Sequence, residues 1–467
     1  MVGITGYGVH IPRYRLTGPV VGAAWGGPGG KTERAVANHD EDAVTMAWAA
    51  LDSCLAGKSR SEVGGIYLAS TSLPYLEMNN SALVASALDL DRDLHSADFA
   101  GSLRAGASAF LSAINGVKAG AAKSFLVAAS DLRQAEPGSP AELEVGDAAG
   151  GLMVGSDNVI AEIKETISLT REMVDVWRRE GETYPHEEDA RFIRENAILP
   201  LLKEAAEKLL KKAGLTKDKI SKVVYTAPDA RTSQTFQKSL GFPETSCPAV
   251  ELYQKIGNVG AALPVLLLIQ ALETAQPGDR ILWLAYGGGC DAFLLEATDK
   301  IGSFPNRGIL APALESRRVI SSYGKFLQFR GSLPSEQVNP YTSTIILNRE
   351  EAAIIRLHGV RCQNCGERYF PPRRICKKCR AKDKFEDWKL GRRGKIYTLT
   401  KDHLPPTPDP PVIMASADIE GGGRFYGQMA DCDPAKAEIG MEVELTFRRL
   451  HEGSGFINYF WKMQPIK

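Results

Sequence analysis

The sequence predicts an α/β protein with two small β-rich domains toward its C-terminal end, and three observations support this prediction. Over residues 1–300, apolar runs of strand length alternate with stretches of helical periodicity, which is the pattern of a layered α/β fold. Between residues 362 and 379, four cysteines form two CxxC pairs. From residue 394 onward, five short strand-like runs are separated by turns rich in Pro, Gly and Asp.

The bulk properties describe an ordinary globular protein. A chain of 467 residues is long enough for two or three domains. Its 56 basic and 56 acidic residues cancel, so net charge gives no argument for binding nucleic acid or a membrane. The longest apolar run, 259–272, is too short to cross a bilayer, and residues 1–16 lack a signal-peptide pattern. With its other cysteines scattered, we expect a cytoplasmic protein that has no membrane contact.

Residues 1–300 are predicted to form the α/β region. Several of the expected strands are almost uniformly apolar or small, as in a sheet covered by helices on both faces. The helix and strand at 102–130 resemble those at 257–288, which indicates a coarse internal duplication. A charge-rich stretch, 170–215, is expected to be helical. The remaining assignments are strands at 3–11, 64–71, 123–130, 149–156, 159–169, 222–228 and 280–288, and helices at 41–57, 102–120, 192–214, 231–240 and 257–275.

The turn Ser102–Gly106 is the position most suited to chemistry in this region. It joins a short apolar run to a helix built from small residues, so the turn lies at the N-terminus of a buried helix. Free backbone N–H groups and the positive end of the helix dipole activate a nucleophile or stabilise an oxyanion there. The residue at the turn is Leu103, which cannot act as a nucleophile.

A linker and a metal site follow the α/β region. Residues 301–355 contain one amphipathic stretch and a Pro/Ser-rich tail, and we expect a linker carrying one docking helix. Two CxxC pairs separated by ten residues form a tetrahedral thiolate cage, which predicts a closed, structural zinc site in a ribbon at 356–391. Two disulfides are the alternative for these cysteines, which are Cys362, Cys365, Cys376 and Cys379.

The five strand-like runs at 392–467 predict a small barrel of OB type. An OB surface that binds nucleic acid needs exposed aromatic and basic side chains. The aromatic residues here lie in strand patterns that indicate half-burial, so nucleic-acid binding is not expected. These residues are Tyr397, Phe425, Tyr426 and Phe447.

Several segments of residues 1–300 carry a family resemblance, in matching order: GVHIPRYRL, SLRAGASAF, GDAAGGLMVGSD, VDVWRREGETYP, IGNVGAALP and PGDRILWLAYGGGCDAF. In these segments the chain resembles the thiolase superfamily, and in particular its HMG-CoA synthase branch. The cysteine-rich segment, GKIYTLT and IGMEVELTFRR resemble the zinc-ribbon and OB-fold proteins that accompany acyl-CoA thiolases and synthases. The resemblance implies a five-layered αβαβα domain fused to these two modules, usual dimerisation, and binding of coenzyme A thioesters.

Members of this family use a cysteine, a glutamate and a histidine to make or break carbon–carbon bonds. At the matching positions this chain has Leu103 for the cysteine, Thr71 for the glutamate and Thr226 for the histidine, while the family asparagine is kept as Asn258. The resemblance therefore implies an acyl-CoA protein that does not use the covalent Claisen mechanism.

Two interpretations remain for the function. The first is an enzyme that performs an aldol or retro-aldol reaction on a CoA thioester without an acyl-cysteine. The second is a non-catalytic subunit that scaffolds an active thiolase or synthase, as a homodimer or in a hetero-oligomer. The acid–base and orienting candidates for the first are Tyr75, Tyr225, Asp229, Tyr253, Tyr286 and Asn258.

Three further groups of residues have weaker roles. Cys290 ends a glycine-rich loop and is a candidate for a relocated nucleophile, but the core-strand pattern after it favours a structural thiol. Ser102 is a weaker candidate of the same kind, because no histidine lies near it in sequence. Four basic ribbon residues are candidates for contacts to the phosphates of coenzyme A: Arg373, Arg374, Lys377 and Lys378.

Overall fold

The computed structural model describes residues 1–243, 250–333 and 342–466. The chain divides into two compact units, each described here by itself. Within the described residues, no helix is long and apolar enough to cross a membrane. Unit 1 comprises Met1–Asn38, Asp42–Ala85 and Leu90–Phe326, and unit 2 comprises His39–Glu41, Ser86–Asp89 and Leu327–Lys467.

Unit 1 contains two halves that repeat one strand order. The first half runs β4-β6-β7-β1, with β5 added at the edge, and the second runs β11-β12-β13-β8. A short pairing of β1 with β8, at Gly3 and Ile4, joins the halves. The repeat agrees with the duplication expected from the sequence. The strands are β1 (Gly3–His10), β4 (Val63–Ala69), β5 (His95–Phe99), β6 (Ser124–Leu132), β7 (Asp147–Gly155), β8 (Ala161–Thr170), β11 (Lys222–Tyr225), β12 (Arg280–Tyr286) and β13 (Gly289–Ala297).

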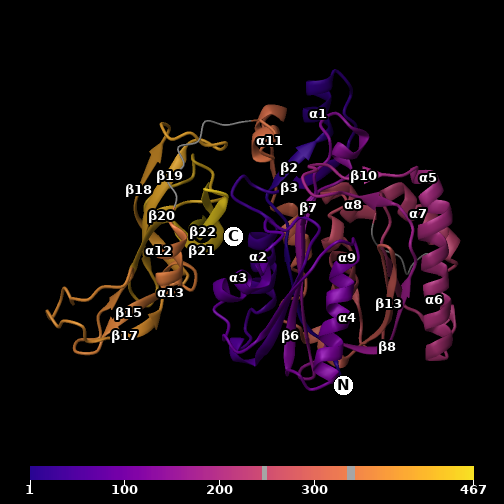
Figure 1. The fold of residues 1–467 in the computed structure, drawn as a ribbon, viewed down its shortest axis with the longest axis horizontal. Coiled ribbons are helices and arrows are strands. Elements are labelled where there is room, and N and C mark those ends of the chain that lie inside the picture. Colours follow the sequence, from indigo (N-terminus) through magenta and orange to yellow (C-terminus); the bar gives the residue numbers. More distant parts are fainter. Residues whose placement is uncertain (244–249, 334–341, 467) are drawn as a thin grey trace. The chain divides into compact units, whose positions relative to one another are not determined.

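Helices separate and cover the two half-sheets in five layers (Figure 1). α4 (Ala105–Lys118) and α9 (Leu263–Thr274) contact each other and lie between the half-sheets, while α2 (Ala43–Cys54) covers the first and α6 (Leu199–Ala213) the second. The composition of α9 explains its place, because it is apolar on all sides and almost fully buried. The predicted αβαβα arrangement is therefore confirmed.

The charge-rich stretch 170–215 is helical only in its second part. Residues 171–189 instead form a small hairpin of β9 (Val176–Trp177) and β10 (His186–Glu187), ahead of α5 (Ala190–Ile193) and α6. The turn contains Gly181 in the left-handed region at φ 81°, and a stacked Trp177–His186 ring pair, with centroids 5.5 Å apart, joins the strands. High charge density had indicated a solvated helix, but this part of the stretch lacks the apolar period that a helix needs.

The expected linker at 301–355 carries several short helices where one was predicted. These are α10 (Leu310–Glu315), α11 (Tyr323–Phe329), α12 (Thr344–Arg349) and α13 (Glu351–Ile354). Its residues 334–341 lie outside the described part of the chain. The break between the two units falls within this segment, after Phe326. The domain bounds read from the sequence stay predictions.

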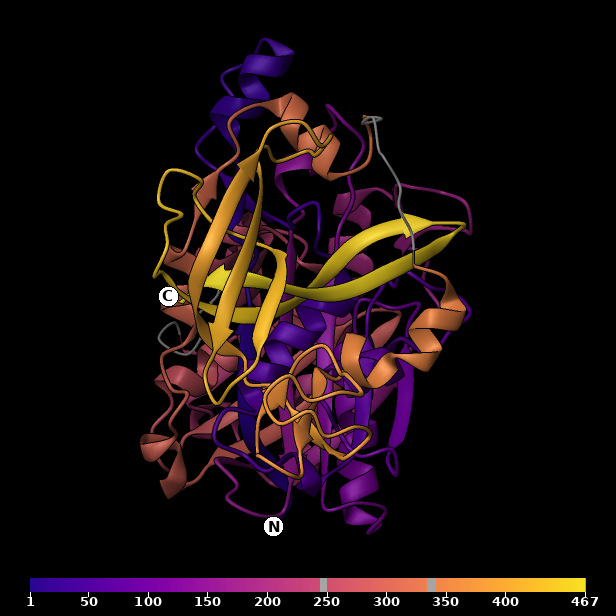
Figure 2. The same cartoon turned by 90° about the vertical axis from the view of Figure 1, so that its left-hand side faces the viewer.

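Unit 2 contains a three-stranded zinc ribbon and a five-stranded antiparallel sheet in the order β20-β19-β18-β21-β22 (Figure 2). Ala430 donates its backbone N–H to Met463 O at 2.8 Å, which links the chain after β20 to β22 and closes the sheet toward a barrel. The five strands predicted from the sequence are all present. They are β18 (Arg393–Asp402), β19 (Val412–Ile419), β20 (Arg424–Gln428), β21 (Glu442–Gly453) and β22 (Phe456–Pro465), and the ribbon strands are β15 (His358–Cys362), β16 (Arg368–Tyr369) and β17 (Phe385–Lys389).

The aromatic residues of this sheet divide between its two faces. Phe425 and Phe447 are fully buried, whereas Tyr397 and Tyr426 are 56% and 67% exposed. The expectation of half-burial is therefore wrong for the two tyrosines, because strand alternation places them on the outer face. The guanidinium of Arg424 lies 3.8 Å from the ring centroid of Tyr397 and pairs with Asp418.

Candidate active site

The turn before α4 is held by the glycine-rich loop at the junction of β12 and β13. Ser102 Oγ donates to Gly287 O at 2.9 Å and accepts from the backbone N–H of Arg104 at 3.2 Å. A Cβ atom on Gly287 would lie 2.7 Å from Arg104 N, so only glycine permits this approach. The hydroxyl of Ser102 therefore anchors the turn.

The side chain of Arg104 fixes the turn from its other side. Its Nη1 atom lies 3.1 Å from Asp291 Oδ1 and 2.9 Å from Leu169 O. Asp291 is 2% exposed, and it also accepts hydrogen bonds from Ser108 Oγ, at 2.7 Å, and from Ser168 Oγ. A buried charge pair with these additional hydrogen bonds holds the head of α4 in one position.

The centre of the site is a buried carboxylate that the sequence analysis did not identify. Asp131 is fully buried at the end of β6 and accepts five hydrogen bonds. Its Oδ1 atom accepts from Ser70 Oγ at 2.8 Å, Thr71 N at 2.6 Å and Ser72 Oγ at 2.9 Å. Its Oδ2 atom accepts from Thr71 Oγ1 at 2.9 Å and Ala261 N at 2.7 Å. A charged residue ending an apolar strand was the signal that could have revealed it.

Asn258 orients the turn before α9. Its side-chain amide donates to Pro228 O at 3.0 Å, and its Oδ1 atom accepts from Gly260 N at 3.0 Å. Gly260 has φ 58°, and a Cβ atom there would lie 2.2 Å from Asp131 Oδ2. The turn of Asn258 is thus fitted onto the Asp131 carboxylate, which agrees with an orienting role.

The three positions that the resemblance assigns to catalytic groups lie on these same connected segments. Thr71 bonds to Asp131, and Thr226 Oγ1 accepts the backbone N–H of Tyr286 at 3.0 Å. A Cβ atom built on Gly287 would lie 3.2 Å from the backbone nitrogen of Leu103. All three side chains are half-buried. The fold therefore links these positions, although their sequence separation is large.

Most of the predicted acid–base candidates already have structural hydrogen bonds. Tyr225 is buried and donates its hydroxyl to Ser233 O at 2.8 Å, while Tyr253 donates to Ala227 O and accepts Ala227 N, both at 2.9 Å. Asp229 caps α7 (Ala230–Leu240). Tyr75 is half-buried, and its backbone carbonyl accepts Asn80 Nδ2 at 3.0 Å. Catalytic roles for these residues stay predictions that the contacts do not favour.

Tyr286 differs from the other tyrosines. Its hydroxyl is buried, and the group beside it is the Asp175 carboxylate. Burial raises the pKa of Tyr286 well above its usual range, and the nearby Asp175 carboxylate raises it further. The phenol is therefore a proton donor at neutral pH, and it directly precedes the loop that packs on the Ser102–Arg104 turn.

Cys290 has the properties of a structural thiol. It is fully buried in β13. Burial raises the pKa of this thiol far above its usual range, and the adjacent Asp291 carboxylate acts in the same direction. The thiolate needed for nucleophilic attack is therefore disfavoured, in agreement with the interpretation favoured by the sequence.

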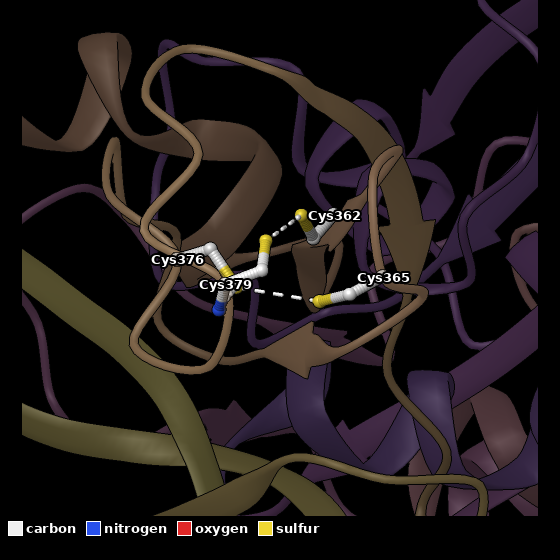
Figure 3. A group of neighbouring side chains, drawn as sticks. All are labelled: Cys362, Cys365, Cys376 and Cys379. Carbon is white, nitrogen blue, oxygen red and sulfur yellow. Dashed lines mark hydrogen bonds between the residues drawn. The ribbon is translucent and has the colours of Figure 1, made fainter.

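The four ribbon cysteines form a separate cluster in unit 2 (Figure 3). The Sγ atoms all lie within 4.8 Å of one another, with 3.6 Å between Cys362 and Cys379 and 3.5 Å between Cys365 and Cys376. Zinc–sulfur bonds of about 2.3 Å in a tetrahedron place sulfur atoms about 3.8 Å apart. The donor set and spacing therefore fit a zinc ion, and the short β15 and β16 strands bring the first CxxC pair into place.

The predicted phosphate-binding residues of the ribbon are largely engaged within it. Arg374 pairs with Asp383 at 2.7 Å, and Lys378 pairs with Glu367 at 3.2 Å. The guanidinium of Arg373 lies 4.6 Å from the ring centroid of Tyr369. Contacts of Arg373, Arg374, Lys377 and Lys378 to coenzyme A stay a prediction.

Two repeated α/β halves, with a tightly held turn at the head of a central helix, define a protein of the thiolase-like class. A family model for the C-terminal part of 3-oxoacyl-[acyl-carrier-protein] synthase III matches residues 210–295. Models for a ChsH2 rubredoxin-like zinc ribbon domain and a ChsH2 C-terminal OB-fold domain match residues 349–386 and 389–448.

Curated proteins extend this similarity over most of the chain. The hydroxymethylglutaryl-CoA synthase of Caldivirga maquilingensis is 33% identical over 341 residues, covering 70% of this chain and 97% of that protein. The Methanopyrus kandleri protein of the same name is 30% identical over 344 residues, covering 71% of this chain and 98% of that protein. The chain belongs to the hydroxymethylglutaryl-CoA synthase family, to which it adds a zinc ribbon and an OB-fold domain.

Solved structures agree with the fold. An HMG-CoA synthase complexed with CoA aligns with a TM-score of 0.64 at 18% identity, covering 73% of this chain and 95% of that one. MvaS in complex with 3-hydroxy-3-methylglutaryl coenzyme A aligns with a TM-score of 0.63 at 20% identity, covering 73% and 94% of the two chains.

Proposed function

We propose that this protein binds a coenzyme A thioester and makes or breaks a carbon–carbon bond by aldol chemistry, without an acyl-cysteine. The single observation that carries this proposal is the turn before α4. Its backbone is held by Ser102, Arg104 and the glycine loop, yet its central side chain is Leu103. Relatives that bear the synthase name and solved structures that contain CoA or a CoA thioester support the substrate class.

The chemistry assigned to this site needs no covalent intermediate. In the cleavage direction, the 3-hydroxyl of a 3-hydroxyacyl-CoA loses its proton and the C2–C3 bond breaks. Its electron pair passes to the thioester enolate, which then takes a proton at C2, and an aldehyde or ketone leaves. The positive end of α4, a helix of 14 residues, stabilises the enolate oxygen.

Tyr286 is the proposed proton carrier in this reaction. Its raised pKa keeps the phenol protonated, so in the bond-forming direction it donates a proton to the alkoxide that develops at C3. In cleavage the Tyr286 hydroxyl passes its own proton to the Asp175 carboxylate while its oxygen accepts the proton of the 3-hydroxyl, so the phenol stays neutral. Asn258 and Asp131 keep the turns in place around this position.

The ribbon cysteines are proposed to hold one structural zinc ion. Four thiolates fill a tetrahedral shell and leave no open position, so the ion would stabilise the fold of unit 2 without entering the reaction. We place the protein in the cytoplasm as a homodimer or a partner of another thiolase-like subunit, in keeping with the family resemblance.

One experiment tests the enzyme interpretation directly. The purified full chain is incubated with short and aromatic 3-hydroxyacyl-CoAs, and release of aldehyde or ketone is followed together with the intact mass of the protein. Turnover without a covalent adduct is expected. An acyl adduct on Cys290 would contradict the proposed mechanism.

A non-catalytic role is the second candidate, favoured by the engagement of the hydroxyls at two of the three family positions. Thr71 donates to Asp131 and Thr226 accepts from Tyr286 N, so neither is poised to act on a substrate. If the lone chain is inactive but gains activity with a co-purifying thiolase, this candidate replaces the first.

A further inference from the structure

An open hollow lies at the base of the β9–β10 hairpin in unit 1. The chain entering β9 forms one wall, and the chain from the end of β10 into α5 forms the other (Figure 1). Glu188 donates its backbone N–H to Asp175 O at 3.0 Å, which joins the two walls. The hollow has a volume of about 740 Å³, and it is lined by Glu172, Met173, Val174, Glu188, Asp189 and Phe192. None of these six residues has a part in the reaction proposed above.

Three of the lining side chains are apolar. Val174 and Phe192 are 54% and 51% exposed, whereas Met173 is half-buried and packs against the core of unit 1. A single exposed apolar side chain is ordinary, but apolar side chains gathered in one hollow mark a surface that binds a partner. The other lining residues indicate the chemistry of that partner.

The other three lining residues carry carboxylates, and no basic side chain lines the hollow. Asp189 Oδ1 accepts Phe192 N at 2.7 Å and Glu188 Oε1 accepts Asp189 N at 3.2 Å, so both carboxylates take part in the start of α5. Within residues 1–243, 250–333 and 342–466, none of Glu172, Glu188 and Asp189 has an ion-pair partner. The hollow therefore presents about three uncompensated negative charges at neutral pH.

Five arginines lie on the same stretch of chain, but they are engaged elsewhere. Arg179 pairs with Glu182 at 2.9 Å, and Arg191 pairs with Glu195 at 3.1 Å. The other three are Arg171, whose charge acts on the Tyr286 phenol, Arg178, which donates to Thr71 O at 2.8 Å, and Arg194, which lies 3.7 Å from Glu195. The described part of the chain thus supplies no cation to the three carboxylates.

The size and shape of the hollow favour a polypeptide segment over a small molecule. A small-molecule pocket buries most of the surface of its ligand, whereas here every lining residue except Met173 is exposed. One turn of helix with its side chains is a cylinder about 10–12 Å wide and about 5.4 Å long, which fills about 400–600 Å³. A hollow of about 740 Å³ therefore accommodates between one and two turns.

We infer that this hollow docks a basic amphipathic segment of a partner polypeptide. Apolar side chains of the segment cover Val174 and Phe192. Its lysine or arginine side chains pair with the three carboxylates, so charge selects the partner and apolar burial supplies the affinity. The inference goes beyond the proposed function, since it concerns an interaction surface and does not depend on the reaction.

The probe is a fluorescently labelled amphipathic peptide that contains only leucine and lysine, and its binding to the full-length protein is followed by fluorescence anisotropy. Two control peptides have glutamate in place of each lysine or serine in place of each leucine. Only the leucine–lysine peptide is expected to bind, and its affinity should fall at least threefold when the salt concentration is raised from about 0.05 M to about 0.5 M. Equal binding of the glutamate peptide would overturn the inference.

Exposed lining residues can be substituted without disturbing the core. Glu172→Gln and Glu188→Gln are each expected to weaken peptide binding about threefold, and Phe192→Ser about tenfold. Glu207→Gln, at an exposed carboxylate on α6, and Leu404→Ser, at a side chain that is 91% exposed, are matched controls that should bind as wild type. Thermal melting of each variant checks its folding.

Wild-type affinity in all three hollow variants would overturn the inference, and so would two results that identify another occupant. If Phe192→Ser turns a dimer into a monomer in light scattering, the hollow belongs to an interface between copies of this chain. If spermidine binds with the same dependence on these variants while the peptide does not bind, the ligand is a small organic cation.

Discussion

Thr71 donates its hydroxyl proton to Asp131 Oδ2 at 2.9 Å and accepts a hydrogen bond from Arg133 on the same oxygen. The Thr71 hydroxyl therefore links the buried Asp131 carboxylate to the Arg133 guanidinium. Thr71→Val keeps the side-chain volume and removes both bonds.

We expect Thr71→Val to lower the free energy of unfolding by about 1–2 kcal/mol, because a hydrogen bond to a charged group is lost. Urea unfolding measures the change. Thr235→Val is the control: its hydroxyl bonds only to a carbonyl on the exposed face of α7, so a change within about 0.5 kcal/mol is expected. An equal effect of the two substitutions would show that Asp131 does not need the Thr71 hydroxyl.

Tyr286→Phe is expected to reduce enzymatic activity without reducing the stability of the fold. Loss of the proton donor is expected to reduce turnover about 100-fold or more. Stability should change by no more than about 1 kcal/mol, since the hydroxyl lost is a single buried group beside the Asp175 carboxylate. The control Tyr253→Phe loses two bonds to Ala227, so it should lower stability by about 1–2 kcal/mol. Full activity in the Tyr286 variant would remove this residue from the mechanism.

The buried ion cluster of unit 2 predicts a specific acid sensitivity. Asp40 lies 2.8 Å from Lys462 Nζ and 3.4 Å from Arg448 Nη1, all three nearly inaccessible to solvent. Burial alone would raise the pKa of Asp40, but Lys462 and then Arg448 outweigh it and hold this pKa well below its usual range.

A carboxyl group whose pKa is lower in the folded protein than in the unfolded chain stabilises the fold. This contribution is complete at pH values above the pKa in the unfolded chain, about 3.9, and is lost as the pH falls from there toward the pKa in the folded protein. Wild type should therefore exceed Asp40→Asn by about 3 kcal/mol at pH 7, with the difference shrinking between pH 4 and pH 2. Urea titrations of both proteins across this range give the comparison. A difference independent of pH would mean that Asp40 is not ionised in the folded protein.

Metal analysis tests the ribbon. The purified chain should contain one zinc ion per molecule, and Cys365→Ser should lose most of it along with the ordered ribbon. Cys432→Ser, at a buried cysteine outside the cluster, should keep the full zinc content. Absence of zinc from wild-type protein prepared without chelator would contradict the assignment.

The sequence predicted those features that have a strong local signal. Helix α9 is apolar on all sides, the β18–β22 strands alternate clearly, and the CxxC spacing is distinctive, so all were found. The hairpin at 176–187 was missed because charged residues obscure its short strands. Its register depends on a tertiary stacking of Trp177 and His186.

The site was predicted only in outline. The resemblance located Leu103, Thr71, Thr226 and Asn258, and the fold connects them. Asp131, Arg133 and Arg178 could not be linked by sequence, because hydrogen bonds that span 61 to 130 residues define their roles. The environment of Tyr286 likewise depends on burial, which a single tyrosine in an apolar run does not reveal.

Unit 2 is discontinuous, and this has a consequence for synthesis of the chain. Asp40 leaves the ribosome early, but its partners Arg448 and Lys462 follow 408 and 422 residues later. At a synthesis rate of about 5–20 residues per second, roughly 20–80 seconds pass between the synthesis of Asp40 and that of Arg448 and Lys462. The C-terminal domains therefore cannot mature before the polypeptide is almost finished, and a fragment expressed from residue 342 onward would bury Arg448 without Asp40 and Glu41.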